Sequence, residues 1–346
     1  MKYLKEEFRN LKPYHSKHIS EGIILNANES PLNIPKGILE KFKSVLDDVN
    51  FNRYPDTDNL KLKEAIAKSY GIEIDNVCVG VGSDEMLNLI FKAVISKGDK
   101  VVVPYPSFTM YKQLGFYAGA SVIEVELDNA FNYDIGLFVE EIKKHDPKLI
   151  FLCVPNNPTG TSLSNSEIEK VLKEANGLVV VDEAYAEFDD KTALDLIKKY
   201  NNLIVLRTFS KAFRLASIRT GYAISTKENI ELLNVVKMPY NLNVLSNEMA
   251  ILAIKNKALI LDNIIEIKKE LEETYNILKG LGIEVYPSKA NFLWCKLDDR
   301  IKKALEENKV YIRSIAFKDQ MYSRITIGSS LEMKKFVKVV SKYANC

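Results

Sequence analysis

Two stretches in the middle of the chain carry side chains that could act together in catalysis. Asp182 directly follows the apolar run 178–181, and Lys211 comes shortly after a second apolar run, 203–206. Continuous apolar runs of this length are typical of strands buried on both faces of a parallel sheet. Ligands of open α/β sheets bind at the carboxyl ends of the strands. We therefore expect Asp182 and Lys211 to meet at that edge.

The groups around this acid and this lysine suit a pyridoxal phosphate site. A lysine amine can form a Schiff base with the aldehyde of the cofactor, and a carboxylate can keep the pyridine nitrogen protonated. Hydroxyl groups and an arginine can bind the phosphate. The sequence supplies a phenol, two hydroxyls and an arginine beside the pair: Tyr185, Thr208, Ser210 and Arg219. Each residue alone is more often a cap or a surface group, so the order of the set carries the hypothesis.

A third stretch predicts a place for the phosphate. The apolar run 77–81 leads into Gly82, after which Ser83, Asp84 and Glu85 open a helical segment. The N–H groups at a helix start carry partial positive charge and can bind an anion without a basic side chain. Ser83 can cap this helix at the same time. A dinucleotide fingerprint is discarded, because Glu85 occupies its third glycine position.

Three polar motifs stand at the ends of predicted strands. They are residues 156–160 (Asn-Asn-Pro-Thr-Gly), 182–185 (Asp-Glu-Ala-Tyr) and 210–213 (Ser-Lys-Ala-Phe). In this order they resemble the motifs of the fold-type I aminotransferases, and most of all those of the histidinol-phosphate aminotransferase family. The resemblance extends over nearly the whole chain. It implies an α/β fold-type I architecture, with a mostly parallel central sheet flanked by helices and a small α+β domain.

Chain length also favours two domains. The 346 residues exceed what one hydrophobic core usually supports, and 47% of them are hydrophobic. We expect an N-terminal arm belonging to the small domain over residues 1–34, a large cofactor-binding domain over 35–276, and a small C-terminal domain over 277–346.

The resemblance implies roles that spacing alone leaves open. It assigns Asn157 a hydrogen bond to the ring oxygen of the cofactor, shared with Tyr185, and it aligns Phe108 with the aromatic residue that stacks on the pyridine ring. It also implies a homodimer in which Tyr54 crosses the interface and donates its hydroxyl to the cofactor phosphate of the other subunit. Without the resemblance, the Arg-Tyr-Pro sequence around Tyr54 indicates only a turn.

Two arginines near the C-terminus are candidates for substrate binding. Arg313 and Arg324 lie on predicted strands with apolar neighbours, where an unpaired guanidinium is costly to bury, so each should meet an anion. That anion could be a protein carboxylate. The resemblance instead assigns both arginines to the substrate cleft, together with Tyr14 and Asn157. By contrast, Asn28 and the glutamate that follows it are expected to pack the small domain.

The resemblance implies transamination, with Asp182, Tyr185 and Lys211 as catalytic residues. Lys211 would anchor the cofactor and act as general base. The implied reaction converts L-histidinol phosphate and 2-oxoglutarate to imidazole-acetol phosphate and L-glutamate, in histidine biosynthesis. Threonine-phosphate decarboxylase and an aromatic-amino-acid aminotransferase of the same fold remain alternatives. A regulatory module that binds pyridoxal phosphate without catalysis is the non-enzyme alternative.

The chain departs from the family pattern just after Lys211. Arg214 and Ser217 stand where the family commonly has glycines. If the backbone there has positive φ, a side chain costs on the order of 1 kcal/mol. Arg214 also adds a charge beside the cofactor loop, so the departure leaves the choice of substrate open.

Charge and cysteine content limit the classes of partner. The 48 basic and 46 acidic residues leave a net charge of +2, too balanced to predict binding to nucleic acid or a membrane. The 4 cysteines form no close pair, which argues against a metal site and a disulfide framework. The N-terminus shows no signal-peptide pattern. We expect a cytoplasmic protein that binds small anionic amines and oxo acids.

Overall fold

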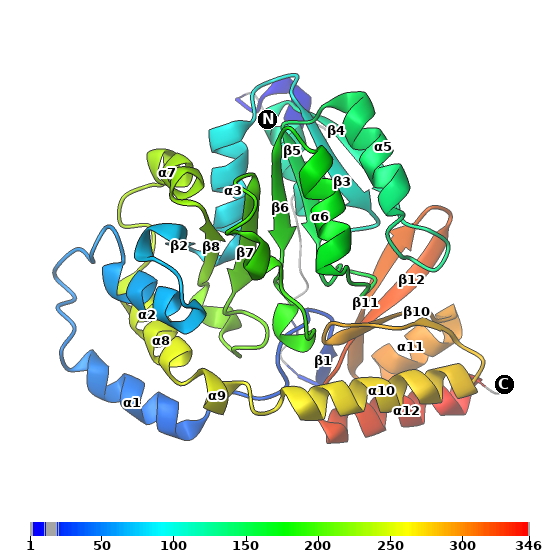
Figure 1. Cartoon of the computed structure of the whole chain (residues 1–346). Helices are drawn as coiled ribbons and strands as arrows, with labels where there is room; N and C mark the ends of the chain where they lie inside the picture. Colours follow the sequence, from blue (N-terminus) through cyan, green and yellow to red (C-terminus); the bar gives the residue numbers. More distant parts are fainter. Residues whose placement is uncertain (1–2, 10, 12–18, 20, 345–346) are drawn as a thin grey trace.

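The computed structural model of the protein describes residues 3–9, 11, 19 and 21–344, and two sheets organise them (Figure 1). Tyr14 lies outside the described residues. The larger sheet has 7 strands, in the order β2 (Val77–Gly80), β8 (Gly221–Ser225), β7 (Leu203–Thr208), β6 (Leu178–Asp182), β5 (Leu149–Cys153), β3 (Lys100–Tyr105) and β4 (Ser121–Glu126). The strands from β7 to β4 run parallel, and β8 is antiparallel to both of its neighbours. The predicted mostly parallel α/β sheet is confirmed.

Helices cover both faces of the larger sheet, which explains why its central strands β5 and β6 are almost entirely apolar. Side chains from α3 (Gly82–Val94), α4 (Met110–Ala118) and α7 (Lys227–Val236) form the core on one face. The core on the other face includes side chains from α1 (Lys36–Leu46), α2 (Leu60–Tyr70), α5 (Ile135–His145), α6 (Asn165–Glu174) and α8 (Val244–Lys255). No helix in the described part of the chain is both long and apolar enough to cross a membrane.

The smaller sheet joins the N-terminal arm to the C-terminal part of the chain. Its order is β1 (Ile23–Leu25), β11 (Val310–Phe317), β12 (Gln320–Thr326), β10 (Phe292–Lys296) and β9 (Glu284–Tyr286). Strand β1 pairs in parallel with β11, and the other pairs are antiparallel. The core beside this sheet includes residues of α10 (Ile264–Gly280), α11 (Asp299–Glu307) and α12 (Ser330–Ala344). The domain boundaries at residues 34 and 276 stay predictions.

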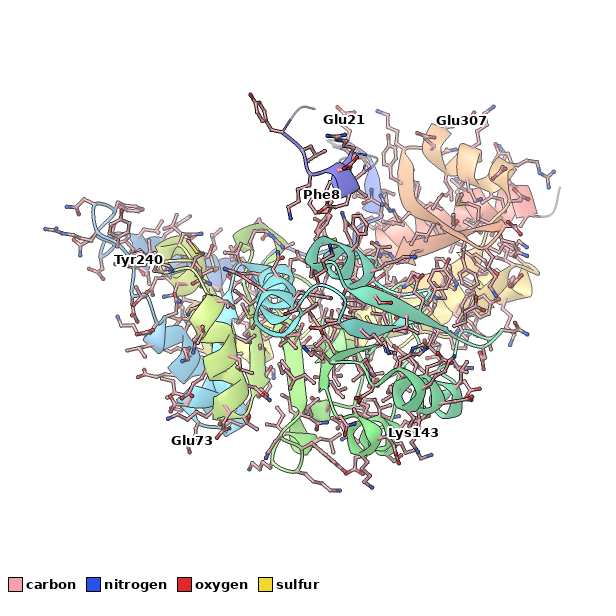
Figure 2. The ribbon with its side chains drawn as sticks, turned by 90° about the horizontal axis from the view of Figure 1, so that it is seen from above. Phe8, Glu21, Glu73, Lys143, Tyr240 and Glu307 are labelled. Atoms are coloured by element: carbon pink, nitrogen blue, oxygen red, sulfur yellow. The ribbon has the colours of Figure 1, made fainter. Side chains whose placement is uncertain are left out.

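Short helical turns complete the chain. They are η1 (Glu6–Phe8), η2 (Ile74–Asn76), η3 (Ala186–Phe188), η4 (Ala193–Leu196), η5 (Ala216–Ile218) and the four-residue helix α9 (Lys257–Ile260). The turn η1 packs on α4, where the ring of Phe8 lies 5.8 Å from that of Phe116 and 5.4 Å from that of Tyr117 (Figure 2). The arm therefore contacts the large-sheet layer before it enters the small sheet as β1.

Candidate active site

Asp182 is the last residue of β6 and is only 4% exposed. Its Oδ1 accepts a hydrogen bond from the Ala184 N–H at 3.1 Å, and its Oδ2 accepts one from the Tyr111 hydroxyl at 2.7 Å. Burial raises the pKa of Asp182 to about 6, although both hydrogen bonds act in the opposite direction. A carboxylate that is buried at such a cost gains strongly from a nearby cation, such as a protonated ring nitrogen.

Tyr111 is a site residue that sequence reasoning did not assign. Its ring is buried, stacks on Phe151 with centroids 4.6 Å apart, and meets Phe108 edge-on at 5.6 Å. These contacts fix the direction in which the hydroxyl points. The signal in the sequence is its place three residues after Phe108, at the start of α4, where the Tyr111 N–H donates to the carbonyl oxygen of Phe108 at 3.2 Å. The stacking role predicted for Phe108 stays a prediction.

Lys211 approaches the N-terminal arm. Its Nζ donates a hydrogen bond to the carbonyl oxygen of Ala27 at 2.8 Å and lies 5.8 Å from the centroid of the Tyr185 ring. Burial lowers the pKa of Lys211 to about 8, and the positive charges of Arg324 and Arg219 act in the same direction. Near neutral pH a usable fraction of the amine is therefore uncharged, as a nucleophile or a general base requires.

The residues of the predicted phosphate site lie together where α3 begins. Arg219 donates to the Ser210 Oγ at 3.2 Å and to the Asp84 Oδ2 at 3.0 Å. A Cβ added at Gly82, where φ is +75°, would lie 2.8 Å from Arg219 Nη2. A Cβ added at Gly221 would lie 2.3 Å from the backbone nitrogen of Ser83. These glycines keep the start of α3 and the guanidinium close together.

This cradle fits the phosphate of pyridoxal phosphate. It combines the outward N–H groups of a 13-residue helix with a guanidinium and a serine hydroxyl, all of which favour an anion. Thr208 braces it, because its hydroxyl donates to the Thr220 carbonyl oxygen at 3.4 Å and accepts from the Ser210 N–H at 3.1 Å. The remainder of the cofactor would need an amine and a buried carboxylate nearby, as Lys211 and Asp182 provide.

Tyr185 lies beside Lys211 and has an unexpected partner. Its hydroxyl oxygen accepts a hydrogen bond from Asn28 Nδ2 at 2.9 Å. Burial raises the pKa of Tyr185 to about 12, while Arg324 acts in the opposite direction. Asn28 does pack the small sheet as expected, but this contact also brings it to the site. Since 157 positions separate the two residues, no local pattern could have predicted their contact.

Arg324 links the small sheet to the strand-end motif and to the arm. Its Nη1 donates to Asn157 Oδ1 at 2.6 Å, and its Nη2 donates to the carbonyl oxygen of Asn26 at 2.8 Å. Arg313 stands directly opposite Arg324 in the β11–β12 pair. Directly opposite residues of an antiparallel pair share one face of the sheet. Two guanidinium groups therefore lie on one face, and their roles in substrate binding stay predictions.

Tyr54 lies on the surface of the chain. It is 81% exposed, and its ring stacks on that of Tyr240 with centroids 4.5 Å apart. Figure 2 shows Tyr240 at one edge of the molecule. Its predicted role across a subunit interface stays a prediction.

Arg214 adopts the left-handed conformation that the glycine pattern suggested. Its φ is +62°, whereas Ser217 lies in η5 without a positive φ. The Arg214 guanidinium is almost fully buried, pairs with Asp262 at 2.5 Å and donates to Asn263 Oδ1. Its charge is therefore neutralised by Asp262.

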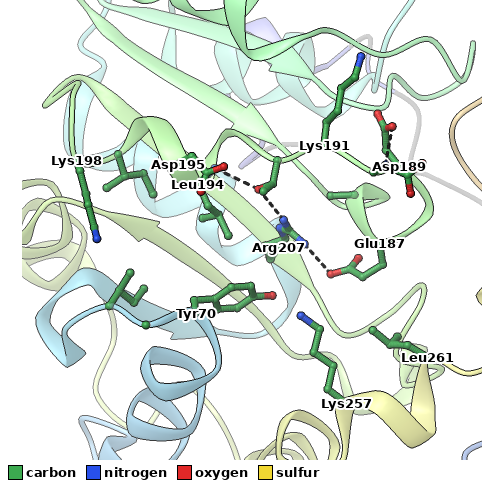
Figure 3. Close-up of a pocket in the computed structure, with 16 residues that line it drawn as sticks. Tyr70, Glu187, Asp189, Lys191, Leu194, Asp195, Lys198, Arg207, Lys257 and Leu261 are labelled. Carbon is green, nitrogen blue, oxygen red and sulfur yellow. Dashed lines mark hydrogen bonds and ion pairs between the residues drawn. The ribbon is translucent and has the colours of Figure 1, made fainter.

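A buried ionic cluster fixes the loop that follows Asp182 and carries Tyr185. On β7, Arg207 contacts Glu183 at 2.6 Å and Glu187 at 2.8 Å. Figure 3 shows Arg207 among the residues that line a pocket of about 500 Å³. Alternation along β6 and β7 places Glu183 and Arg207 on the face of the sheet opposite to Asp182. The cluster therefore stabilises the strand ends from that opposite face.

The ionic cluster yields a stability prediction. Arg207→Met leaves two buried carboxylates without their cation, so we expect the free energy of unfolding to fall by about 3–5 kcal/mol. Urea denaturation measures this value. The matched control is Lys199→Met, which removes an exposed ion pair with Glu169 and should change stability little. Equal small effects of the two substitutions would contradict the role given to the cluster.

A second prediction concerns the Tyr111 hydrogen bond. The pKa of Asp182 in the folded protein, about 6, lies above the usual value for an aspartate. The free energy of unfolding therefore falls as the pH rises from that usual value to about 6, and it stays lower above it. Tyr111→Phe removes a bond that stabilises the ionised form. We expect the cofactor-free protein to lose about 1.5–3 kcal/mol at pH 8, and less at pH 5, where Asp182 is mostly protonated.

Tyr133→Phe is the control for this measurement, because the buried Tyr133 hydroxyl donates to the carbonyl oxygen of Cys153 rather than to a carboxylate. Its loss of stability in urea should be similar at both pH values. If Tyr111→Phe were also independent of pH, the hydrogen bond to ionised Asp182 would not exist in solution.

The chain is similar to known aminotransferases. The family model for aminotransferase class I and II matches residues 20–340. The histidinol-phosphate aminotransferase of Thermoanaerobacter pseudethanolicus is 40% identical over 331 residues, which cover 94% of each chain. That of Pyrococcus furiosus is 37% identical over 339 residues, covering 98% of this chain and 97% of the relative.

Solved structures show the same fold. The histidinol-phosphate aminotransferase of Sinorhizobium meliloti, solved in complex with pyridoxal 5'-phosphate, has a TM-score of 0.90 at 22% identity and covers 100% of this chain and 98% of its own. The chain therefore belongs to the class I and II aminotransferases and, within them, to the histidinol-phosphate aminotransferase family. It is a pyridoxal-phosphate-dependent aminotransferase that acts on amino and oxo acids, which favours an enzyme over a regulatory module.

Proposed function

We propose that the protein transfers the amino group of L-histidinol phosphate to 2-oxoglutarate, giving imidazole-acetol phosphate and L-glutamate, in histidine biosynthesis. The observation that carries this proposal is the pair Arg313 and Arg324 on one face of the small sheet, with Arg324 hydrogen-bonded to Asn157. Both proposed substrates are anions, and a guanidinium binds carboxylates and phosphates with two parallel hydrogen bonds. The names of the relatives support the same substrate.

We propose a role for each residue of the site. When bound, pyridoxal phosphate supplies a ring that accepts electrons while a bond to the substrate's Cα is broken. Asp182 would keep the ring nitrogen protonated, because a buried carboxylate is stabilised by a cation. Lys211 would hold the cofactor and then move the proton of Cα, for which a pKa of about 8 is well placed. Asn157 and Tyr185 would bind the ring oxygen, and the cradle around Arg219 the phosphate.

A screen of amino donors tests the proposed substrate. The cofactor-loaded protein is mixed with histidinol phosphate, phenylalanine, tyrosine or threonine phosphate, without an oxo acid, and its near-visible absorbance is followed. We expect histidinol phosphate to react with a kcat/KM at least about tenfold above the aromatic amino acids, because its phosphate meets the arginines. Faster reaction of phenylalanine or tyrosine, or release of carbon dioxide from threonine phosphate, would favour the alternative enzymes.

Arg324→Lys tests the substrate-binding face. Lysine keeps the charge but cannot reproduce two parallel hydrogen bonds, so the KM for 2-oxoglutarate should rise roughly 10- to 100-fold. Steady-state kinetics measure it. Arg300→Lys, on the exposed start of α11, is the control and should leave KM unchanged. An unchanged KM in Arg324→Lys would place the substrate elsewhere.

We also propose a homodimer in which Tyr54 reaches the cofactor phosphate of the other subunit. The proposal is supported by exposed apolar side chains close in sequence to the stacked Tyr54 and Tyr240, namely Phe51, Val235 and Met238. Exposed apolar patches commonly mark interfaces.

A complementation experiment tests this arrangement. Tyr54→Ala and Lys211→Ala variants, each impaired alone, are unfolded together and refolded as a mixture. If Tyr54 acts across the interface, half of the dimers are hybrids with one complete site of two, so about a quarter of wild-type activity should return. A double variant carrying both changes in one chain, mixed with wild type, provides the control. No recovery in the mixture would mean that Tyr54 serves its own subunit or none.

We also propose the domain boundaries of the chain and its cellular compartment. We propose the division into an arm over residues 1–34, a large domain over 35–276 and a small domain over 277–346. The proposal is supported by the hydrophobic core beside the small sheet, most of whose residues lie after position 276 and which also includes Leu25 of the arm. We propose a cytoplasmic location, supported by the free, buried thiols of Cys78, Cys153 and Cys295.

A further inference from the structure

The hydrogen bonds around Asn28 determine which atom of its side-chain amide faces Tyr185. The backbone N–H of Asn28 donates to Thr326 Oγ1 at 2.9 Å, and the same hydroxyl donates to Asn28 Oδ1 at 3.1 Å. Asn28 is 0% exposed and Thr326 2%, so water does not compete for these groups. Because the Thr326 proton goes to the amide oxygen of Asn28, the amide nitrogen is the atom that faces Tyr185.

This orientation determines which way the Tyr185 hydroxyl points. An amide nitrogen donates hydrogen bonds and does not accept them. Across the 2.9 Å contact the Tyr185 oxygen must therefore accept, and its own hydrogen must point elsewhere. A phenol that receives a hydrogen bond is also a better donor, because hydrogen bonds in a chain polarise one another.

We propose that Thr326 and Asn28 are positioning residues that make the Tyr185 hydroxyl an obligatory hydrogen-bond donor to the ligand beside Lys211. That ligand is the ring oxygen of pyridoxal phosphate, so the inference deepens the proposed contact of Tyr185 with the cofactor and rests on it. The chain of donors runs from Thr326 through Asn28 to Tyr185. It joins the end of β12, the segment after β1 and the loop after β6.

The backbone of Asn28 is held as firmly as its side chain. Its φ is +56°, a left-handed conformation in which asparagine is enriched, and its carbonyl oxygen accepts from Asn291 Nδ2 at 3.1 Å. The amide thus has a fixed place and fixed partners. An apolar residue would fill the same space, but it could not set the direction of the Tyr185 hydroxyl.

The direction of this bond has a measurable consequence. A donor at the ring oxygen stabilises its ionised form and lowers the pH at which the near-visible absorbance of the bound cofactor titrates. The other titratable groups that act on Tyr185 are Arg324 on β12, Cys153 on β5 and Asp182 on β6, and Lys211 lies 5.8 Å from its ring. None of these groups is altered by a substitution at Asn28.

The test compares Asn28→Asp with Asn28→Gly in cofactor-loaded protein without substrate. A carboxylate at position 28 can only accept, so Tyr185 would donate to it and the titration midpoint should rise by about one pH unit or more. Glycine keeps the positive φ and both backbone hydrogen bonds, and it leaves the Tyr185 hydroxyl able to donate to the cofactor. Its midpoint should move by less than about a third of that shift.

A double-mutant cycle separates hydrogen-bond direction from added charge. If Asn28→Asp acts through the hydroxyl, its shift should vanish in a Tyr185→Phe background; a shift that persists there would come from the new charge alone and would overturn the inference. Tyr185→Phe alone should raise the midpoint. If Tyr185→Phe does not raise the midpoint, the proposed contact of Tyr185 with the cofactor is wrong. If Tyr185→Phe raises the midpoint but Asn28→Asp does not, only the proposed chain of donors is wrong.

Substitutions at Thr326 provide a second route that adds no charge. Thr326→Val removes the hydroxyl that orients the amide, and Thr326→Ser keeps it. We expect the valine variant to raise the midpoint and the serine variant to match wild type, with urea denaturation showing that both cofactor-free proteins fold. Equal midpoints for the two variants would contradict the proposed role of Thr326.

Discussion

The burial of the Asp182 carboxylate is the constraint on which the site depends. A carboxylate that is 4% exposed at the end of a strand is costly unless its charge is compensated. Two donors, the Tyr111 hydroxyl and the Ala184 N–H, offset part of that cost, yet the pKa of Asp182 still rises to about 6. A protonated pyridine ring would satisfy the remaining demand for positive charge. Burial of this one carboxylate thus favours the binding of a cationic ligand.

Elements of both sheets position the residues around Asp182. Parallel strands place Asp182 beside the β7 end that leads to Lys211. Arg219 joins Ser210 to Asp84 at the start of α3, where we propose that the phosphate binds. The Arg207 cluster fixes the following loop from the opposite face of the sheet. The segment after β1 closes the site from the small sheet, because its backbone carbonyls accept from Lys211 and Arg324. Both sheets therefore contribute residues to one site, although only the larger one carries the acid and the lysine.

The sequence predicted where Asp182, Lys211 and Gly82 stand in the fold, because strand ends and helix starts can be located from the apolar pattern of the chain. Apolar runs ending in Asp182 and before Lys211 indicated buried parallel strands, and the rule for strand ends then brought the two residues together. Gly82 before a helix start predicted an anion site in the same way, and that site stays a proposal. The contacts of Tyr111 with Asp182 and of Asn28 with Tyr185 could not be predicted, because they depend on how separate layers pack and join residues 71 and 157 positions apart.

The attachment of the cofactor to Lys211 is tested most directly by chemical trapping. The cofactor-loaded protein is reduced with borohydride, digested and analysed by mass spectrometry. The structure predicts a pyridoxyl group on the peptide that contains Lys211, where the amine has a lowered pKa and the strand ends converge. Modification of a different lysine, or of none, would contradict the account.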